Sequence, residues 1–264
     1  MLLCFDIGNT DIYGGVFEGT EVRYEFRKSN QSRPSADEFG VFMLHWMQAR
    51  GIDPKAIDAV GIASVVPDSL PSVVNACRTY LDLEPLVLEV GVKTGLKIQV
   101  HDPREVGADR IANAIAAVQM FPGRDLLVVD MGTATTVCAI TRDKVYLGGA
   151  IIAGLRLCMN ALGRGTAKLP LVDIIRPTQA LGKTTIDNIQ SGLYFGHIGT
   201  LKEIFARLRQ EAFAGREPLI IGTGGFSRLF REEGLFDEII PGLVLQGLRL
   251  AVEMNPAPLR QADR

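Results

Sequence analysis

A carboxylate followed within four residues by glycine and threonine occurs twice in this sequence. The first copy is DIGNT at residues 6–10, and the second is DMGTATT at residues 130–136. Glycine lets backbone N–H groups approach a ligand closely, a hydroxyl donates hydrogen bonds, and a carboxylate holds a metal ion that bridges phosphate oxygens. Each loop is therefore suited to a phosphate, although a strand hairpin with a polar turn has the same local pattern.

The two copies share more than their turns. Each acid ends an apolar strand, a second apolar strand follows the loop, and a short polar turn at residues 18–20 or 142–144 leads into a third strand. A match of the turn together with three strands predicts an internal duplication. Two facing phosphate loops, one from each half, would form a nucleotide cleft between two related domains.

Hydrophobic periodicity predicts the elements that position these loops. Helices are expected at residues 37–50, 70–83, 111–120, 155–162, 186–210 and 243–253. Further strands are expected at residues 59–66, 86–89, 96–100 and 219–221. Strand triplets followed by alternating helices and strands, twice over, predict an α/β fold of two ribonuclease-H-like halves.

Composition narrows the classes of function. A formal charge of −2 and an isoelectric point near 6.0 provide no electrostatic footprint for nucleic acid or an anionic membrane. The N-terminus lacks a basic region and reaches Asp6 almost at once, which is unlike a signal peptide, and no apolar stretch is long enough to span a bilayer. The four cysteines stand singly among apolar neighbours, as expected of buried free thiols in a reducing cytoplasm.

An acid and a base stand together at the start of the helix expected at residues 111–120. Asp109 falls in its first turn, where the helix dipole favours a carboxylate, and Arg110 presents a planar donor fork for a carboxylate or phosphate. The alternative is that Asp109 and Arg110 are only the acid and the base in the first turn of a well-capped helix, with no role in chemistry.

Glycines mark two other segments. GTGG at residues 222–225 follows a strand and permits close approach to a flat ring such as adenine, but it lacks the third glycine of a dinucleotide fingerprint. The helix at 186–210 contains three glycines, Gly192, Gly196 and Gly199. Each lowers the stability of the helix by about 1 kcal/mol relative to alanine. We therefore expect them to pack closely against another backbone, either of this chain or of a second subunit. GKTT at residues 182–185 does not complete a Walker A loop.

Five motifs in order carry a resemblance to a known family. They are DIGNT at 6–10, GADR at 107–110, DMGTATT at 130–136, TAKLP at 166–170 and GTGG at 222–225. Together they resemble type III pantothenate kinases of bacterial coenzyme A biosynthesis, within the acetate and sugar kinase, heat-shock chaperone and actin superfamily. The resemblance extends from residue 2 to about residue 255.

That resemblance implies a kinase that uses ATP and Mg²⁺ to phosphorylate pantothenate, with Asp109 as general base. It implies Mg²⁺ near Asp6 and a monovalent cation, K⁺ or NH₄⁺, at Asp130. The residues implied to bind ATP are Asp6, Ile7, Gly8, Asn9, Thr10, Asp11, Ile12, Tyr13 and Thr133. The residues implied to bind pantothenate are Val100, Gly107, Ala108, Asp109, Arg110 and Thr185.

The family forms homodimers, so the resemblance also implies a second copy of this chain as partner. It implies an N-terminal domain at residues 1–118 with the first loop and the catalytic acid. A C-terminal domain at 119–264 would carry the second loop and the adenosine-side glycines. Three positions depart from the family pattern: Val100 replaces a frequent tyrosine, Ala153 a proline and Thr184 an asparagine.

Two other functions stay open at this stage. One is a non-catalytic relative whose nucleotide cleft serves regulation. The presence of Asp6, Asp109 and Asp130 argues against it, because a protein without catalytic activity would not need these carboxylates. The other is a kinase, or a phosphohydrolase, of the same superfamily that acts on another small substrate. Because Val100 lacks the hydroxyl and the aromatic ring of that tyrosine, it bears on substrate affinity and on substrate choice.

Overall fold

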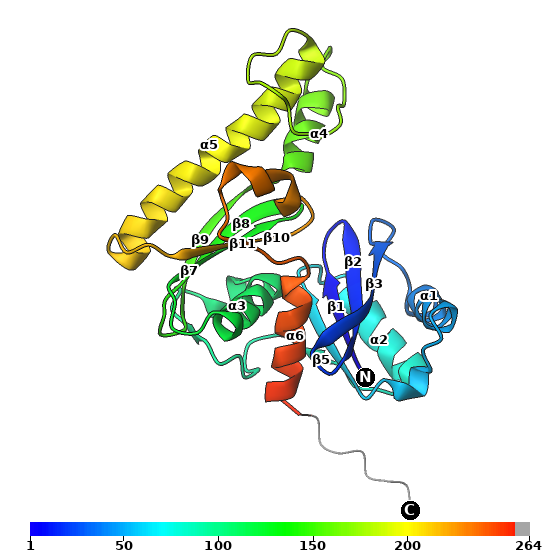
Figure 1. Ribbon diagram of the computed structural model, residues 1–264. Helices are drawn as coiled ribbons and strands as arrows, with labels where there is room; N and C mark the ends of the chain where they lie inside the picture. The colour runs from blue at the N-terminus through cyan, green and yellow to red at the C-terminus, as the bar shows by residue number, and fades with distance from the viewer. Residues whose placement is uncertain (257–264) are drawn as a thin grey trace, which may run out of the picture. The chain divides into compact units, whose positions relative to one another are not determined.

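The computed structural model, described here for residues 1–256, divides into two compact units (Figure 1). The first unit contains Met1–Gly95, Asp102–Ala116 and the chain from Leu243 to residue 256; the second contains Leu96–His101 and Ala117–Gly242. The last helix therefore returns to the first unit. The predicted domains 1–118 and 119–264 describe two halves of a duplication and stay a prediction.

The first unit is built on a five-stranded sheet in the order β3-β2-β1-β4-β5. Its strands are β1 (Leu2–Ile7), β2 (Asp11–Glu18), β3 (Glu21–Ser29), β4 (Ala59–Ser64) and β5 (Leu86–Val87). The first three are antiparallel, whereas β4 runs parallel to β1 and β5 parallel to β4. Of the strand predicted at 86–89, only two residues pair.

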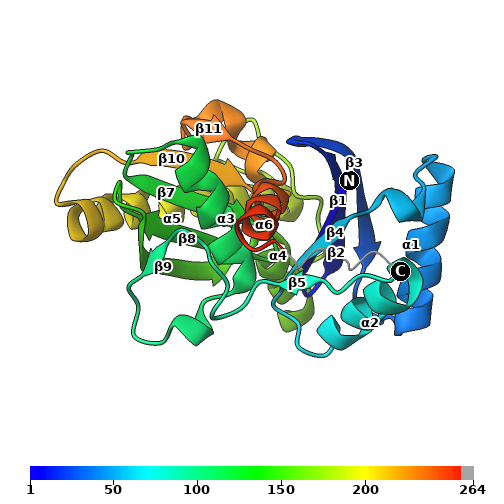
Figure 2. The same cartoon turned by 90° about the horizontal axis from the view of Figure 1, so that it is seen from below.

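Helices cover both faces of this sheet (Figure 2). The helices on these faces are α1 (Ala36–Ala49), α2 (Leu70–Leu81) and α6 (Leu243–Met254). A further helix, α3 (Ala108–Met120), belongs to this unit up to Ala116 and packs on α6, where a Cβ atom at Gly247 would overlap the carbonyl oxygen of Ala112. On one face Phe5 of β1 meets Phe39 of α1 edge to face, with ring centroids 5.4 Å apart. On the other face a Cβ atom at Gly61 would lie 2.8 Å from Val252, so α6 packs close to the sheet. Burial on both faces explains the near-continuous apolar character of β1 and β4.

The second unit repeats this plan. Its six-stranded sheet has the order β11-β10-β7-β8-β9-β6. The strands are β6 (Lys97–Ile98), β7 (Leu126–Met131), β8 (Ala134–Ile140), β9 (Val145–Ala153), β10 (Leu219–Thr223) and β11 (Glu238–Ile239). An antiparallel triplet is followed by two parallel strands beside its first member, as in the first unit. This match confirms the predicted duplication.

The pairing across the two loops is similar, although the first loop is one residue longer than the second. Asp6 pairs with Tyr13 across the first loop, and Asp130 pairs with Thr136 across the second. Each triplet also has a register shift late in its second strand, at Val16/Phe17 and at Ala139/Ile140. β6 is an addition at the edge, where it runs parallel to β9.

Two further helices belong to the second unit, α4 (Leu155–Gly165) and α5 (Thr185–Phe213), which lie beside each other in Figure 1. A capping box starts α5, because Thr184 accepts from the N–H of Asp187 and Asp187 accepts from the N–H of Thr184. The helix packs on the sheet through buried residues that include Tyr194 and Leu201.

Short elements escaped the periodicity analysis. They are β11 and the 3₁₀ helices η1 (Pro54–Ala56), η2 (Pro103–Glu105) and η3 (Ser227–Glu233). These segments are too short for a hydrophobic repeat to be recognised, so the periodicity of the sequence does not predict them.

Two expectations about packing need correction. A Cβ atom at Gly192, Gly196 or Gly199 would meet no atom within 4 Å among the described residues, so these glycines do not pack closely within the chain. Cys4, Cys77 and Cys138 are buried as predicted, but Cys158 is only half-buried on α4. Close packing of these glycines against a second subunit stays a prediction.

Candidate functional site

The first loop is a tight turn between β1 and β2. The N–H of Gly8 donates to the carbonyl of Asp11 at 3.0 Å and closes the turn. Because Asp6 and Tyr13 are paired across the hairpin, their side chains lie on the same face of the sheet. The Tyr13 hydroxyl donates to Glu25 at 2.6 Å, and the guanidinium of Arg27 lies 4.0 Å from the centre of its ring.

A residue that the sequence analysis missed ties this loop to the rest of the unit. The side-chain amide of Asn30 donates to the carbonyl of Gly8 at 2.8 Å, and its backbone N–H donates to the carbonyl of Thr10 at 2.8 Å. No motif signals this role, since Asn30 is a single polar residue after β3, separated from the loop by two strands.

Asp109 lies in the first turn of α3, as predicted. One carboxylate oxygen accepts from the N–H of Arg110 at 2.8 Å. That oxygen also occupies the space that a Cβ atom at Gly107 would need, which explains the glycine of the GADR motif. Burial raises the pKa of the Asp109 carboxyl above its ordinary value, and the N–H and charge of Arg110 oppose this only in part. The result is a half-buried carboxylate with increased affinity for a proton.

Glycines from two distant segments surround the second loop. The N–H of Gly132 donates to the carbonyl of Ala134 at 3.1 Å. A Cβ atom at Gly154 would lie 2.6 Å from the carbonyl oxygen of Gly132, and one at Gly224 would lie 2.6 Å from the N atom of Met131. Gly224 therefore packs against the second loop itself, a contact that the strand-and-glycine pattern did not predict.

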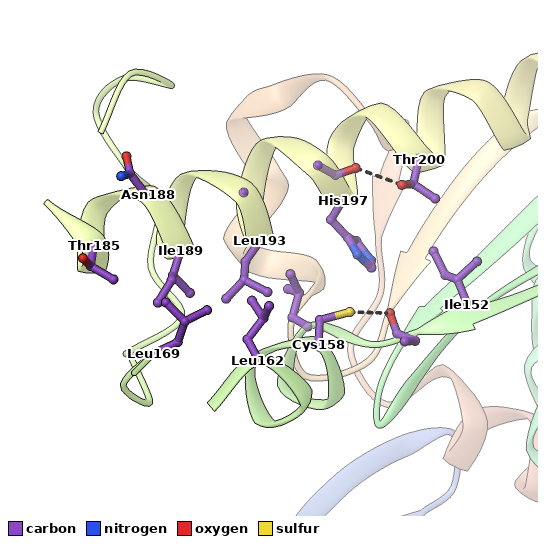
Figure 3. Close-up of a pocket in the computed structure, with 14 residues that line it drawn as sticks. Ile152, Cys158, Leu162, Leu169, Thr185, Asn188, Ile189, Leu193, His197 and Thr200 are labelled. Carbon is purple, nitrogen blue, oxygen red and sulfur yellow. Dashed lines mark hydrogen bonds between the residues drawn. The ribbon is translucent and has the colours of Figure 1, made fainter. Parts of the chain in front are cut away.

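The remaining predicted substrate residues lie elsewhere in the second unit. Val100 follows β6 and faces β9, where a Cβ atom at Gly148 would lie 3.7 Å from its side chain. Thr185, the first residue of α5, lines a pocket of about 590 Å³ between α4, α5 and the end of β9 (Figure 3).

That pocket is mainly apolar. Leu162, Leu169, Ile189 and Leu193 point into it from α4, α5 and the intervening loop (Figure 3). Two polar side chains that line it already donate hydrogen bonds to the backbone. The hydroxyl of Thr200 donates to the carbonyl of Gly196 at 2.9 Å, and the thiol of Cys158 donates to the carbonyl of Ala153 at 3.6 Å. His197 at its inner end lies 3.1 Å from the Thr135 hydroxyl, and burial lowers the pKa of its imidazole.

The predicted site residues thus fall into two sets. Residues 6–13 and 107–110 belong to the first unit, whereas Val100, Asp130, Thr133 and Thr185 belong to the second. Within residues 1–256 no three His, Cys, Asp or Glu side chains gather as a metal cluster, and no helix is both long and apolar enough to cross a bilayer.

Comparison with known proteins identifies the family. Residues 2–207 match the family model described as type III pantothenate kinase. The chain belongs to the type III pantothenate kinase family. A type III pantothenate kinase of Legionella pneumophila is 50% identical over 257 residues, which cover 97% of this chain and 100% of that protein. Type III pantothenate kinase 1 of Francisella tularensis is 47% identical, with 97% and 100% covered.

Solved structures agree on the fold. A protein of Sinorhizobium meliloti named as a 2-dehydro-3-deoxygalactonokinase superposes with a TM-score of 0.64 at 13% identity, covering 97% of this chain and 100% of that one. A protein of Campylobacter jejuni named for the Baf family of transcriptional activators superposes with a TM-score of 0.61 at 19% identity, covering 96% and 98%. These likenesses support the duplicated ribonuclease-H-like fold of the type III pantothenate kinase family.

Proposed function

We propose that this protein transfers the γ-phosphate of ATP to the terminal hydroxyl of pantothenate, giving 4′-phosphopantothenate and ADP, the first step of coenzyme A biosynthesis. The observation that carries the proposal is Asp109, a half-buried carboxylate with a raised pKa in the first turn of α3. It stands within GADR, in a chain that belongs to the type III pantothenate kinase family.

Asp109 acts as general base in this mechanism. The pantothenate hydroxyl oxygen forms a bond to the γ-phosphorus as the bond from phosphorus to the bridging oxygen of ADP breaks, and the hydroxyl proton passes to Asp109. A raised pKa favours this transfer, because a carboxylate with more affinity for protons is a stronger base. Positioning and charge neutralisation supply most of the remaining rate acceleration.

The ATP phosphates are held by the stretch from Asp6 to Tyr13 and by Thr133. The turn closed by Gly8 and Asp11 presents backbone N–H groups, which suit phosphate oxygens. Mg²⁺ commonly takes only one or two carboxylates and completes its shell with phosphates and water, so the single carboxylate of Asp6 fits that ion. When bound, Mg²⁺ neutralises charge on the phosphates.

A monovalent cation, K⁺ or NH₄⁺, binds at Asp130 in this proposal. The carboxylate ends β7, and the close packing of Gly224 and Gly132 holds it in place. Carboxylate and carbonyl oxygens suit a hard cation such as K⁺ and accept hydrogen bonds from NH₄⁺. Here the cation stabilises the second loop, which contributes Thr133 to ATP.

Pantothenate is bound by Val100, Gly107, Ala108, Arg110 and Thr185, with Arg110 meeting the substrate carboxylate. The planar guanidinium is suited to a carboxylate because it donates two parallel hydrogen bonds. Val100 removes the hydroxyl and the aromatic face that a tyrosine would provide, so affinity for pantothenate depends more on the other residues.

The protein forms a homodimer through α4 and α5 in this proposal. Gly192, Gly196 and Gly199 of α5 meet no close neighbour among residues 1–256, and the first two line the pocket between α4 and α5, although a helical glycine costs stability unless something packs on it. Most of the exposed large apolar side chains of residues 1–256 lie in the neighbouring segment: Ile151, Leu157, Leu162, Leu171, Ile175, Leu181 and Ile186. An exposed apolar surface of this kind commonly marks an interface.

The cellular location in this proposal is the cytoplasm. The four cysteines are free, which suits a reducing compartment.

An ADP-release assay with ATP, Mg²⁺ and K⁺, run with and without pantothenate, tests the function. Pantothenate-dependent release, with the 4′-phosphorylated product identified by its mass, supports the proposal. ATP turnover that ignores pantothenate would indicate another substrate. Nucleotide binding without any turnover would indicate a regulatory protein.

A further inference from the structure

We propose that Asn30 is a positioning residue that sets the orientation of the first phosphate loop, with Ser69 as its support. This rests on the proposed function in one respect, since it takes residues 8–11 as the turn that binds the ATP phosphates. Neither residue belongs to any of the five motifs.

The contacts of Asn30 are those of a buried clamp. Its side chain is 2% exposed and donates to the carbonyl of Gly8 at 2.8 Å, while its backbone N–H donates to the carbonyl of Thr10 at 2.8 Å. The remaining side-chain oxygen accepts from the hydroxyl of Ser69 at 3.0 Å. One asparagine thus holds two carbonyls of a four-residue turn.

Holding these carbonyls fixes the N–H groups that follow them. Residues 1–256 contain no cis peptide bond, and in a trans peptide the carbonyl of one residue and the N–H of the next point in opposite directions. With the carbonyls of Gly8 and Thr10 directed at Asn30, the N–H groups of Asn9 and Asp11 point away from it. In this proposal they are the N–H groups that donate to the phosphate oxygens.

The hydroxyl of Ser69 makes an unusual hydrogen bond for a residue at the start of a helix. It is the N-cap residue of α2, where a serine normally accepts a hydrogen bond from the first turn of its own helix. Here it makes no such cap bond, and its hydroxyl, in a residue 1% exposed, donates to Asn30 instead. The chain therefore forgoes a stabilising cap on α2 and uses the hydroxyl to fix the amide of Asn30.

The second loop is held differently, which makes the clamp specific to the first. There the backbone N–H of Phe226 donates to the carbonyl of Met131 at 3.2 Å, and Gly224 packs against the loop. A backbone donor tolerates most side chains. The first loop instead depends on one side-chain amide that both donates and accepts, a combination that an ionised aspartate of the same size cannot provide.

The test compares Asn30→Asp and Ser69→Ala with the unmodified protein. Asn30→Asp places a carboxylate oxygen against the carbonyl of Gly8, and Ser69→Ala removes the support. We expect the dissociation constant for Mg-ATP, measured by calorimetry, to rise about tenfold in the first variant and about threefold in the second. KM for ATP should rise in parallel, whereas KM for pantothenate should stay within about twofold.

Ile57→Val is the matched control for stability. Ile57 is buried and precedes β4 by two residues. The start of β4 pairs with Leu2, at the opposite end of β1 from Ile7 and the first loop. This control should lower the unfolding temperature slightly and leave ATP binding unchanged. If Asn30→Asp fails to fold, the dissociation constant of Ser69→Ala for Mg-ATP decides the proposal.

The proposal is overturned if both folded variants bind Mg-ATP within about twofold of the unmodified protein, or if Ile57→Val weakens binding equally. It is also overturned if KM for pantothenate rises as much as KM for ATP. Failure of the proposed function is a separate result: an unmodified protein that binds Mg-ATP but does not phosphorylate pantothenate leaves the binding test of Asn30 intact.

Discussion

The backbone of Gly224 lies directly against the side chain of Asp130, because a Cβ atom at position 224 would overlap Oδ1 of that carboxylate. Gly224 also has a φ of +83°, which side chains rarely adopt. The neighbouring Gly225 has neither property, since a Cβ atom there would meet no atom within 4 Å among the described residues. Two adjacent glycines of one motif thus have different structural requirements.

We therefore expect Gly224→Ala to destabilise the protein and Gly225→Ala to leave its stability nearly unchanged. Strain at a positive φ combined with overlap against Asp130 should cost about 1–3 kcal/mol in the free energy of unfolding. Urea unfolding of the two variants measures this directly. Equal losses would mean that neither the positive φ of Gly224 nor its close contacts with Asp130 and the backbone of Met131 require a glycine.

Asp109→Asn should lower kcat by about a hundredfold to ten-thousandfold, because the amide cannot accept the hydroxyl proton. Binding of Mg-ATP should change little, since that variant leaves the first loop intact. Steady-state kinetics together with calorimetry separates the two effects. Asp102→Asn, which alters the cap of η2, is the matched control and should retain activity. A near-normal kcat in Asp109→Asn would remove Asp109 from the base role.

Much of the fold followed from local pattern. The first loop and DMGTATT each lie within a strand triplet, and a triplet of apolar runs with short polar turns is strongly specified by residues close in sequence. The position of Asp109 in the first turn of its helix is predictable for the same reason, because the signals that start the helix are adjacent to it in sequence.

What the sequence did not reveal depends on contacts between distant residues. Asn30 reaches Gly8 across two intervening strands, and Gly224 reaches Asp130 from nearly a hundred residues away. Neither contact has a spacing rule, because it depends on how the sheet is assembled. The glycines of α5 show the same limit: their small size predicts close packing against this chain or against a second subunit, and the described residues contain no such packing within the chain.

Replacing K⁺ by Na⁺ should reduce activity sharply if a monovalent cation binds at Asp130. Asp130→Asn should lower activity in K⁺ and remove most of the difference between the two ions, because a neutral amide oxygen binds a cation less tightly than a carboxylate does. The measurement is kcat as a function of each chloride salt at constant ionic strength. Equal activity in K⁺ and Na⁺ in the unmodified protein would reject the assignment.

The homodimer predicts a mass twice that of the 28.7 kDa chain in light scattering. Leu181→Asp combined with Ile186→Asp should shift the protein toward monomer, because both side chains are exposed and apolar in the segment assigned to the interface. Val41→Asp is the matched control, since Val41 is also exposed and apolar but lies on α1. A monomeric unmodified protein, or dissociation by Val41→Asp alone, would contradict the proposed surface.

Asp125 should make stability depend on acid pH. It is 7% exposed, accepts from the N–H of Arg142 at 2.9 Å and pairs with the guanidinium of Arg216 at 2.8 Å. Burial raises the pKa of this carboxyl, but the arginine side chain and the N–H more than offset it, so its pKa lies below the ordinary value of 3.8. A lowered pKa contributes stability above pH 3.8 that is lost as the pH falls through the folded-state value.

Asp125→Asn should therefore cost about 2 kcal/mol at neutral pH, and the difference from the unmodified protein should shrink below about pH 4. Unfolding by urea across this range measures the difference. Asp143→Asn, an exposed acid in the turn after β8, is the control and should stay within about 0.5 kcal/mol at every pH. A cost for Asp125→Asn that did not change with pH would mean that shape and hydrogen bonding, rather than charge, account for the role of Asp125.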